Sequence, residues 1–156
     1  MPSYRGHLIG GVVTYIVVLQ GIQYAQPNAH VIFQGFLFCL LGSLFPDIDV
    51  KSKGQKVFYS LLLLFLLYCL YMQKWIIFTS LSLLGIVPML VRHRGLFHQI
   101  WFLLFLTLVM MVCMSSLQKS YSAILLANCC FFFAGCLSHV VLDRVYSKVK
   151  RFFSKK

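Results

Sequence analysis

Residues 121–143 read YSAILLANCCFFFAGCLSHVVLD, an apolar run without a Lys, Arg, Asp or Glu before its last residue. The hydrocarbon core of a bilayer is about 30 Å thick, so a helix needs about 20 apolar residues to cross it. Five further apolar runs precede this one, at residues 7–24, 30–46, 56–72, 75–91 and 96–117. The pattern predicts an all-α fold, a polytopic membrane helix bundle with about six transmembrane helices.

The composition excludes an ordinary soluble domain. Hydrophobic residues make up 60% of the chain and charged residues only 11%, and the mean hydropathy is +0.86. A length of 156 residues fits one transmembrane helical domain, residues 1–146, followed by a basic cytoplasmic tail at residues 147–156. The six cysteines lie inside the apolar runs without C-x-x-C spacing, so neither a disulfide framework nor a cysteine zinc site is expected.

The basic residues are distributed unevenly over the connections between the apolar runs. With six spans, only Lys74 and Lys119 of the 14 Lys and Arg residues fall on one side of the membrane. The positive-inside rule then predicts that both termini are cytoplasmic. Basic side chains at the cytoplasmic helix ends are expected to contact anionic lipid headgroups. No aromatic-interleaved basic motif is present, so no specific nucleic acid partner is expected.

The acidic residues are few and lie beside histidines. The chain has no glutamate and three aspartates, Asp47, Asp49 and Asp143. In the predicted topology these aspartates lie at the cytoplasmic ends of the apolar runs, and so do four histidines: His7, His93, His98 and His139. Ionisable groups at membrane depth are costly and are therefore functional candidates. Because Asp and His together form the ligand set of a divalent metal site, we treat these seven residues as candidate metal ligands.

The end of the second apolar run contains the first motif. Pro46 lacks an N–H group and disfavours helix at the preceding residue, so the helix is expected to stop at Phe45. Asp47 and Asp49 then fall in non-helical chain, where they could bind one ion or bridge two. The alternative is an ordinary helix-stop turn in which the aspartates pair with nearby lysines such as Lys51.

The connection between the fourth and fifth runs contains the second motif. His93 and His98 flank an Arg94–Gly95 corner, and both histidines could reach a metal ion. The planar guanidinium of Arg94 suits a phosphate or carboxylate group of a substrate. The alternative is a positively charged loop at the membrane interface.

The first and last runs contain the remaining candidates. His139 and Asp143 are four residues apart on one helix face, so both could bind one ion, or Asp143 could orient the His139 ring. A local ion pair between Asp143 and Arg144 is the alternative. Gly10 and Gly11, which follow His7, predict that a neighbouring helix approaches the first helix closely.

Together these motifs resemble one family. The ordered set consists of Gly6-His7, Pro46-Asp47-Ile48-Asp49, Lys53-Gly54-Gln55, His93-Arg94-Gly95 with His98, and Gly135 through His139 to Asp143. It resembles the YdjM-type family of bacterial inner-membrane proteins, which are described as metal-dependent hydrolases. The resemblance covers about residues 6–143 and implies a multi-pass protein of the bacterial inner membrane with metal-dependent hydrolytic activity. The matched polar positions are His7, Asp47, Asp49, His93, His98, His139 and Asp143. The chain departs from the family pattern at Val50, at Phe97 and after Asp143.

The expected function is metal-dependent hydrolysis at the cytoplasmic membrane interface. One or two divalent ions (Zn, Mn or Fe) would activate water for attack on an ester or phosphoester, and a lipid-like substrate suits this location. Asp49 is the expected base, and Arg94 is expected to hold an anionic group. The alternatives are a metal-ion transporter or sensor, whose ligands should be spread over the membrane depth, and a non-catalytic membrane scaffold. The sequence leaves the substrate, the metal and the oligomeric state open.

Overall fold

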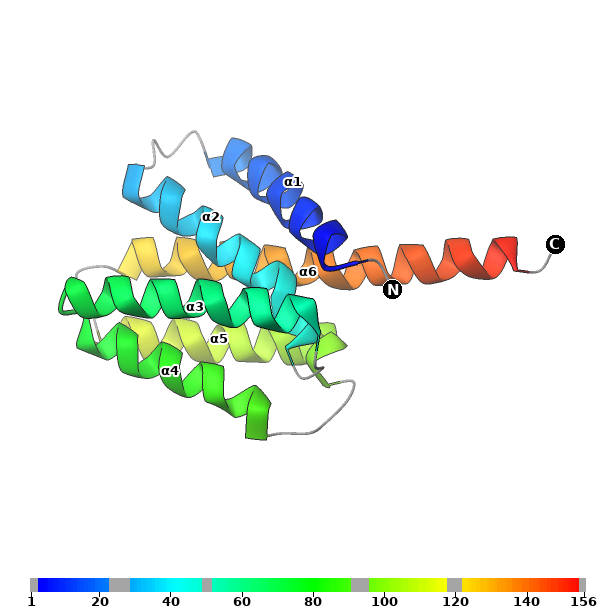
Figure 1. Ribbon diagram of the computed structural model, residues 1–156. Coiled ribbons are helices and arrows are strands. Elements are labelled where there is room, and N and C mark those ends of the chain that lie inside the picture. Colours follow the sequence, from blue (N-terminus) through cyan, green and yellow to red (C-terminus); the bar gives the residue numbers. More distant parts are fainter. Residues whose placement is uncertain (1–2, 23–28, 49–51, 91–95, 118–121, 155–156) are drawn as a thin grey trace.

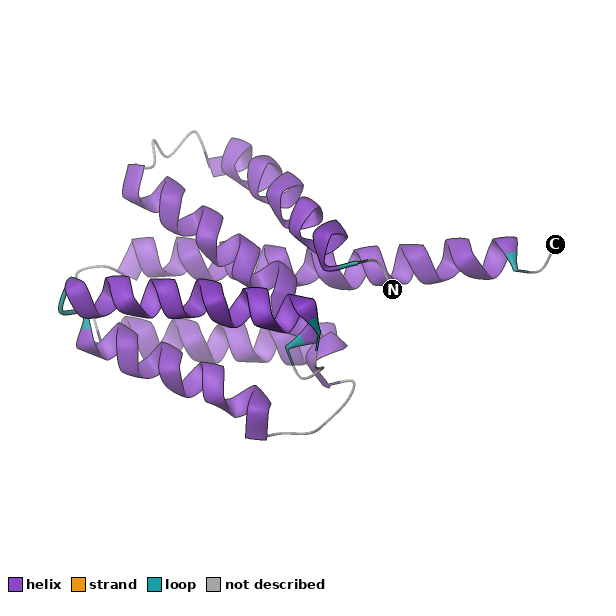
Figure 2. Cartoon of the chain, in the orientation of Figure 1, coloured by secondary structure: helices purple, strands orange, loops and turns teal. Residues whose placement is uncertain are grey.

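The computed structural model describes residues 3–22, 29–48, 52–90, 96–117 and 122–154. These segments are helical and contain no strand, which confirms the all-α prediction for the described part of the chain (Figure 2). In chain order the elements are α1 (Tyr4–Ile22), α2 (Ala29–Leu44), the 3₁₀ helix η2 (Phe45–Asp47), α3 (Lys53–Tyr71), α4 (Trp75–Leu90), the 3₁₀ helix η3 (Leu96–His98), α5 (Ile100–Leu117) and α6 (Ser122–Phe153).

The boundary between α2 and α3 follows from local chemistry. The α-helix ends at Leu44, which confirms the predicted stop, but the chain continues as the 3₁₀ helix η2 around Pro46. The expectation that Asp47 lies in non-helical chain was therefore wrong, because Asp47 is the last residue of η2. Ser52 caps the start of α3, because its Oγ accepts a hydrogen bond of 3.0 Å from the Gln55 N–H. The Gln55 side chain donates a hydrogen bond of 2.8 Å to the Ile48 carbonyl, so the start of α3 is tied to the end of η2.

The last helix is longer than the sequence predicts. The sixth apolar run ends at Asp143, but α6 continues to Phe153 and extends beyond the rest of the bundle (Figure 1). The segment after Asp143 contains no Gly or Pro, and its Lys and Arg residues are good helix formers. The helix therefore continues without interruption past residue 146, the predicted boundary between the transmembrane domain and the basic tail.

Helix α6 runs along α2, and α1 and α5 also pack against it (Figure 1). The backbones of α2 and α6 touch at two glycines. A Cβ atom on Gly42 would collide with the Phe132 carbonyl, and a Cβ atom on Gly135 would collide with the Cys39 carbonyl. Because the obstructing atoms belong to the backbone, only glycine fits at these two positions, as at close helix contacts in membrane proteins.

Helix α1 packs onto this pair through its own glycines. A Cβ atom on Gly11 would lie 2.7 Å from Ser43 Oγ of α2, and one on Gly10 would collide with Leu142 of α6. The Cys39 thiol also donates a hydrogen bond of 3.3 Å to the Gly11 carbonyl. The predicted close approach at Gly10 and Gly11 is therefore confirmed.

The outer surface of the bundle is apolar. On α1, Ile9, Val13 and Val17 are 65%, 56% and 62% exposed, and α3, α5 and α6 carry similar residues. Soluble monomers rarely expose such extended apolar surfaces. Of the described helices, Lys53–Tyr71 and Leu126–Phe153 are long and apolar enough to cross a membrane, while Val31–Asp47 and Ile100–Val112 are apolar but shorter. Six spans and cytoplasmic termini stay predictions.

Candidate metal centre

Five of the seven candidate ligands come together in space. The start of α1 and the end of α2 lie at the same end of the bundle (Figure 1). The first helix contributes His7, the two 3₁₀ helices contribute Asp47 and His98, and α6 contributes His139 and Asp143. The other two candidate ligands, Asp49 and His93, and the predicted anion-binding residue Arg94 lie outside the described residues.

Four atoms form the centre of this group, and we call them the four-ligand cluster: His98 Nε2, His139 Nε2, Asp47 Oδ1 and Asp143 Oδ2. His98 Nε2 lies 3.4 Å from Asp47 Oδ1 and 3.5 Å from Asp143 Oδ2. His139 Nε2 lies 3.6 Å from each of the same two oxygens. Each nitrogen therefore faces both carboxylates.

The protonation of His139 follows from its second ring nitrogen. Its Nδ1 lies 2.7 Å from the Ser43 carbonyl oxygen. A carbonyl oxygen can only accept, so Nδ1 carries the hydrogen and donates it. In the neutral ring, Nε2 then presents a lone pair to the two carboxylates, and it has no hydrogen-bond partner within the described segments. Metal-binding histidines are commonly held in this way, with the outer N–H donated to a backbone carbonyl.

The nitrogen–oxygen distances in the four-ligand cluster suit pairs of metal ligands, and the ligand atoms form two overlapping sets within 4.8 Å of one another, Asp47/His98/His139 and His7/His139/Asp143. Charge-assisted N–H···O bonds measure about 2.7–2.9 Å. Two ligands bound tetrahedrally at about 2.0–2.2 Å from one ion lie about 3.3–3.6 Å apart. The four nitrogen–oxygen distances in the cluster are 3.4–3.6 Å. This mixed nitrogen and oxygen set fits a divalent cation such as Zn, Mn or Fe.

The ring of His7 lies directly on the ring of His139. The ring centroids are 3.7 Å apart and the planes are inclined by only 13°. His7 Nε2 lies 3.6 Å from Asp143 Oδ1, the carboxylate oxygen that is not part of the four-ligand cluster. Neither ring nitrogen of His7 has a hydrogen-bond partner among the described residues.

Burial decreases from one side of the group to the other. The side chains of His139 and His7 are 0% and 1% exposed, and that of Asp143 is 13% exposed. Asp47 and His98 are 25% and 27% exposed. The group is therefore most accessible to solvent on the side formed by η2 and η3.

Aromatic packing positions that open side. Phe45, which begins η2, meets Phe97 of η3 edge to face with ring centroids 5.6 Å apart. Both rings are buried, with 4% and 2% of their surface exposed. This contact ties Asp47 to His98, because each ligand lies within two residues of one of the two rings.

The family model of the YdjM inner membrane protein matches residues 1–153. The chain belongs to this family. The match confirms the resemblance inferred from the motifs, and the family description places its members in the inner membrane. A search of the curated proteins and a search of the solved structures each found no match.

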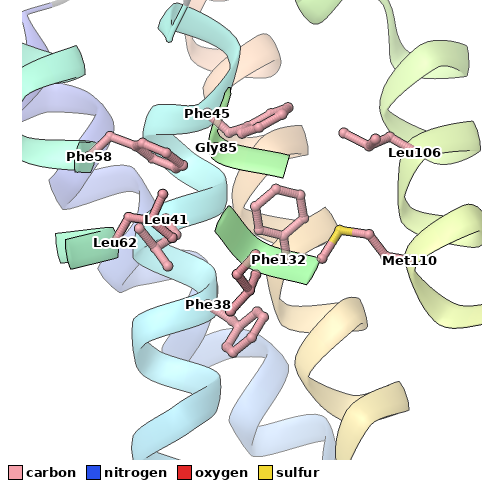
Figure 3. A pocket seen from close by; sticks show the side chains of 10 residues that line it. Phe38, Leu41, Phe45, Phe58, Leu62, Gly85, Leu106, Met110 and Phe132 are labelled. Carbon is pink, nitrogen blue, oxygen red and sulfur yellow. The ribbon is translucent and has the colours of Figure 1, made fainter. Parts of the chain in front are cut away.

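A small apolar cavity lies between the helices (Figure 3). Its volume is about 30 Å³, roughly that of one water molecule. Its lining is entirely apolar and comes from all helices except α1: Phe38, Leu41, Phe45, Phe58, Leu62, Leu81, Gly85, Leu106, Met110 and Phe132. An apolar space of this size offers a ligand neither room nor a polar partner, so the metal centre is the better functional candidate.

Two contacts of the candidate metal centre could not be predicted from the sequence. The Ser43 carbonyl orients His139, but every residue has a carbonyl, and nothing marks this one. The His7–His139 stacking depends on how α1 crosses α6. The positions of Gly11 and Gly135 hint at close helix contacts, but they do not identify which rings or carbonyls will meet.

Proposed function

We propose that this chain is a membrane-bound, metal-dependent hydrolase that cleaves an ester or phosphoester at the cytoplasmic membrane interface. The observation that carries the proposal is the four-ligand cluster, in which imidazole nitrogens face carboxylate oxygens at 3.4–3.6 Å. The lone pair of His139 Nε2 faces two carboxylate oxygens at this distance, an arrangement that a divalent cation would stabilise. The gradient of burial leaves the cation accessible from one side, as a catalytic metal requires.

The residues of the cluster would hold the cation, and the hydrogen bond to the Ser43 carbonyl would keep His139 in the tautomer that binds it. Bound there, a divalent cation supplies Lewis acidity, which polarises a carbonyl or phosphoryl oxygen and activates water for attack. Asp49 is the proposed base, and Arg94 is proposed to hold an anionic group. Covalent geometry limits the Cα of Asp49 to about 7 Å from that of Asp47, and the Cα of Arg94 to about 14 Å from that of His98.

A lipid-linked substrate is proposed because the site lies at the end of an apolar bundle. An apolar groove of about 500 Å³ runs between α2 and α3 and includes Leu37, Leu61 and Phe65 in its lining. Leu37 is ten residues before Asp47, a distance of about 15 Å along a helix. An acyl chain that extends from this groove to the cluster would have to span at least about 15 Å.

Hydrolysis of a lipid panel tests the proposal. Protein purified in detergent is incubated with phospholipids and lipid-linked phosphates, and the release of inorganic phosphate or fatty acid is measured. We expect His139→Ala to lower the rate at least about 100-fold, since removal of a ligand costs more than the 10–100-fold seen for outer-sphere partners. His30→Ala, in the first turn of α2 at the other end of the bundle, is the matched control and should keep the wild-type rate.

Two results would contradict the hydrolase. Wild-type protein that contains no Zn, Mn or Fe, and is unaffected by chelation, would support a scaffold. Metal flux into proteoliposomes without hydrolysis would support a carrier. A carrier is less well supported, because its ligands should be spread through the membrane, whereas the described ligands group at one end.

A further inference from the structure

We propose that the centre holds two divalent cations that share the Asp143 carboxylate, the second of them bound by His7. This inference rests on the proposed metal-dependent function. In it, Oδ2 of Asp143 belongs to the four-ligand cluster, while Oδ1 and His7 Nε2 bind the second ion. Four observations on the described residues carry it.

The first observation is the environment of His7. Its side chain is 1% exposed, and neither ring nitrogen has a hydrogen-bond partner in the described part of the chain. A buried imidazole nitrogen without a partner is costly, and more so next to a membrane interior. Packing alone does not explain a histidine here, because a phenylalanine would fill the same space without that cost.

The second observation is the direction in which His7 points. Its Nε2 faces Asp143 Oδ1 at 3.6 Å, a distance longer than a charge-assisted hydrogen bond. Asp143 Oδ1 is itself buried and without a hydrogen-bond partner in the described segments. A nitrogen and an oxygen that both lack a hydrogen-bond partner therefore face each other at a separation that two ligands of one ion also show, as in the four-ligand cluster.

The third observation is how the two carboxylate oxygens are divided. His98 and His139 lie against Oδ2, whereas His7 lies against Oδ1. His139 has only one nitrogen available, because Nδ1 is held by Ser43. One ion can use that nitrogen together with Oδ2, so His7 and Oδ1 form a second binding position.

The fourth observation is the stacking of His7 on His139. The rings are nearly parallel, 3.7 Å apart, and each Nε2 is directed at the same carboxylate. Ions bound to two such nitrogens would be separated by about the ring spacing. Two-metal hydrolytic sites hold their ions about 3.5–4 Å apart.

Two cations also constrain the substrate. The described residues contribute two carboxylates to the centre, Asp47 and Asp143, so two divalent ions leave a net positive charge there. A phosphoryl group, which carries negative charge, fits this centre better than a neutral carboxylic ester. We therefore expect phosphate, and not fatty acid, to be released from the lipid panel.

The test counts ions in the full-length protein with Mn²⁺ as the probe. Protein in detergent is loaded with Mn²⁺ and freed of excess metal, and its manganese is measured by mass spectrometry. We expect about two ions per chain in the wild type and about one in His7→Phe. Phenylalanine keeps a ring stacked on His139 and removes only the ligand nitrogens, so a purely structural role of His7 would leave the count unchanged. His30→Ala is again the matched control and should keep the wild-type count.

Electron paramagnetic resonance gives a second readout on the wild type alone. Two Mn²⁺ ions that share a carboxylate couple magnetically, whereas a single bound ion gives an isolated six-line signal. About one ion per chain with an uncoupled signal, or the same count in the wild type and His7→Phe, would overturn the two-ion proposal and leave a one-metal hydrolase. A wild type that binds no manganese, zinc or iron would overturn the proposed function as well.

Discussion

At the scale of single residues, His139 determines the chemistry of the centre. One face of its ring packs on His7, its Nδ1 is fixed by the Ser43 carbonyl, and its Nε2 faces two carboxylates. The side chain is completely buried, so its contacts are made with these neighbours and not with solvent. A change at this position is expected to disturb both the metal and the packing between helices.

The two partly exposed ligands should separate metal binding from folding. We expect His98→Ala and Asp47→Asn to lower metal affinity at least about 10-fold and to leave the helix content unchanged, because neither side chain belongs to the buried core. Metal content and circular dichroism in detergent measure the two effects. If a variant retains its metal, the substituted residue is not a metal ligand. If a variant fails to fold, the substituted residue has a structural role.

Bound metal should also stabilise the fold. A ligand that binds only the native state, present at about 100 times its Kd, adds about 2.7 kcal/mol to the free energy of unfolding. We therefore expect chelation to lower the Tm of the wild type by more than it lowers the Tm of His139→Ala. Thermal unfolding in detergent, with and without chelator, measures the difference. An equal shift in both proteins would mean that the metal binds elsewhere.

At the scale of helices, the contact between α2 and α6 sets the register of the site. Gly42 precedes Ser43, and Gly135 lies one turn before His139. The backbone contact at these glycines therefore brings the Ser43 carbonyl within 2.7 Å of the His139 ring. A wider spacing between the helices would break that hydrogen bond first.

A methyl group at this contact tests the register. We expect Gly135→Ala to lower the free energy of unfolding by about 1–3 kcal/mol, because the new Cβ meets the backbone carbonyl of Cys39, which cannot move aside. Metal content should fall as well. Gly21→Ala in α1, where nothing lies within 4 Å of the new atom, is the control and should leave stability and metal content unchanged. Equal behaviour of the two variants would show that α2 and α6 are not in backbone contact.

The helices were more predictable from the sequence than their contacts. Apolar runs and Pro46 predict most helix boundaries, because both act within a few residues of chain. The extension of α6 to Phe153 is missed, because a hydropathy pattern ends with the apolar run while helix propensity continues. Backbone contacts at Gly42 and Gly135 depend on residues about 90 positions apart, which local patterns do not relate.

At the scale of the whole molecule, the arrangement of helix ends explains why the ligands could be predicted at all. An alternating path through the membrane brings every second connection to the same side, so residues far apart in sequence share one level. Five candidate ligands lie together as this argument predicts. Their division between the four-ligand cluster and His7 could not be predicted, because topology defines a level and not the direction of a side chain.

The same topology makes a prediction about orientation. With six spans and the observed charge distribution, the C-terminus should be cytoplasmic. A reporter fused after Lys156 should therefore be active if it functions in the cytoplasm and inactive if it functions only in the periplasm. Paired fusions, one to a cytoplasmic reporter and one to a periplasmic reporter, measure this directly. A periplasmic signal at the C-terminus would place the metal centre on the other side of the membrane and exclude a cytoplasmic substrate.

The metal centre joins the beginning of the chain to its end. His7 comes from the first helix, whereas His139 and Asp143 come from the last. During translation, the ribosome must therefore synthesise nearly the entire polypeptide before the ligands can meet. Truncated or stalled chains would lack His139 and Asp143, so any metal that the complete set binds could enter only after the last helix has been made.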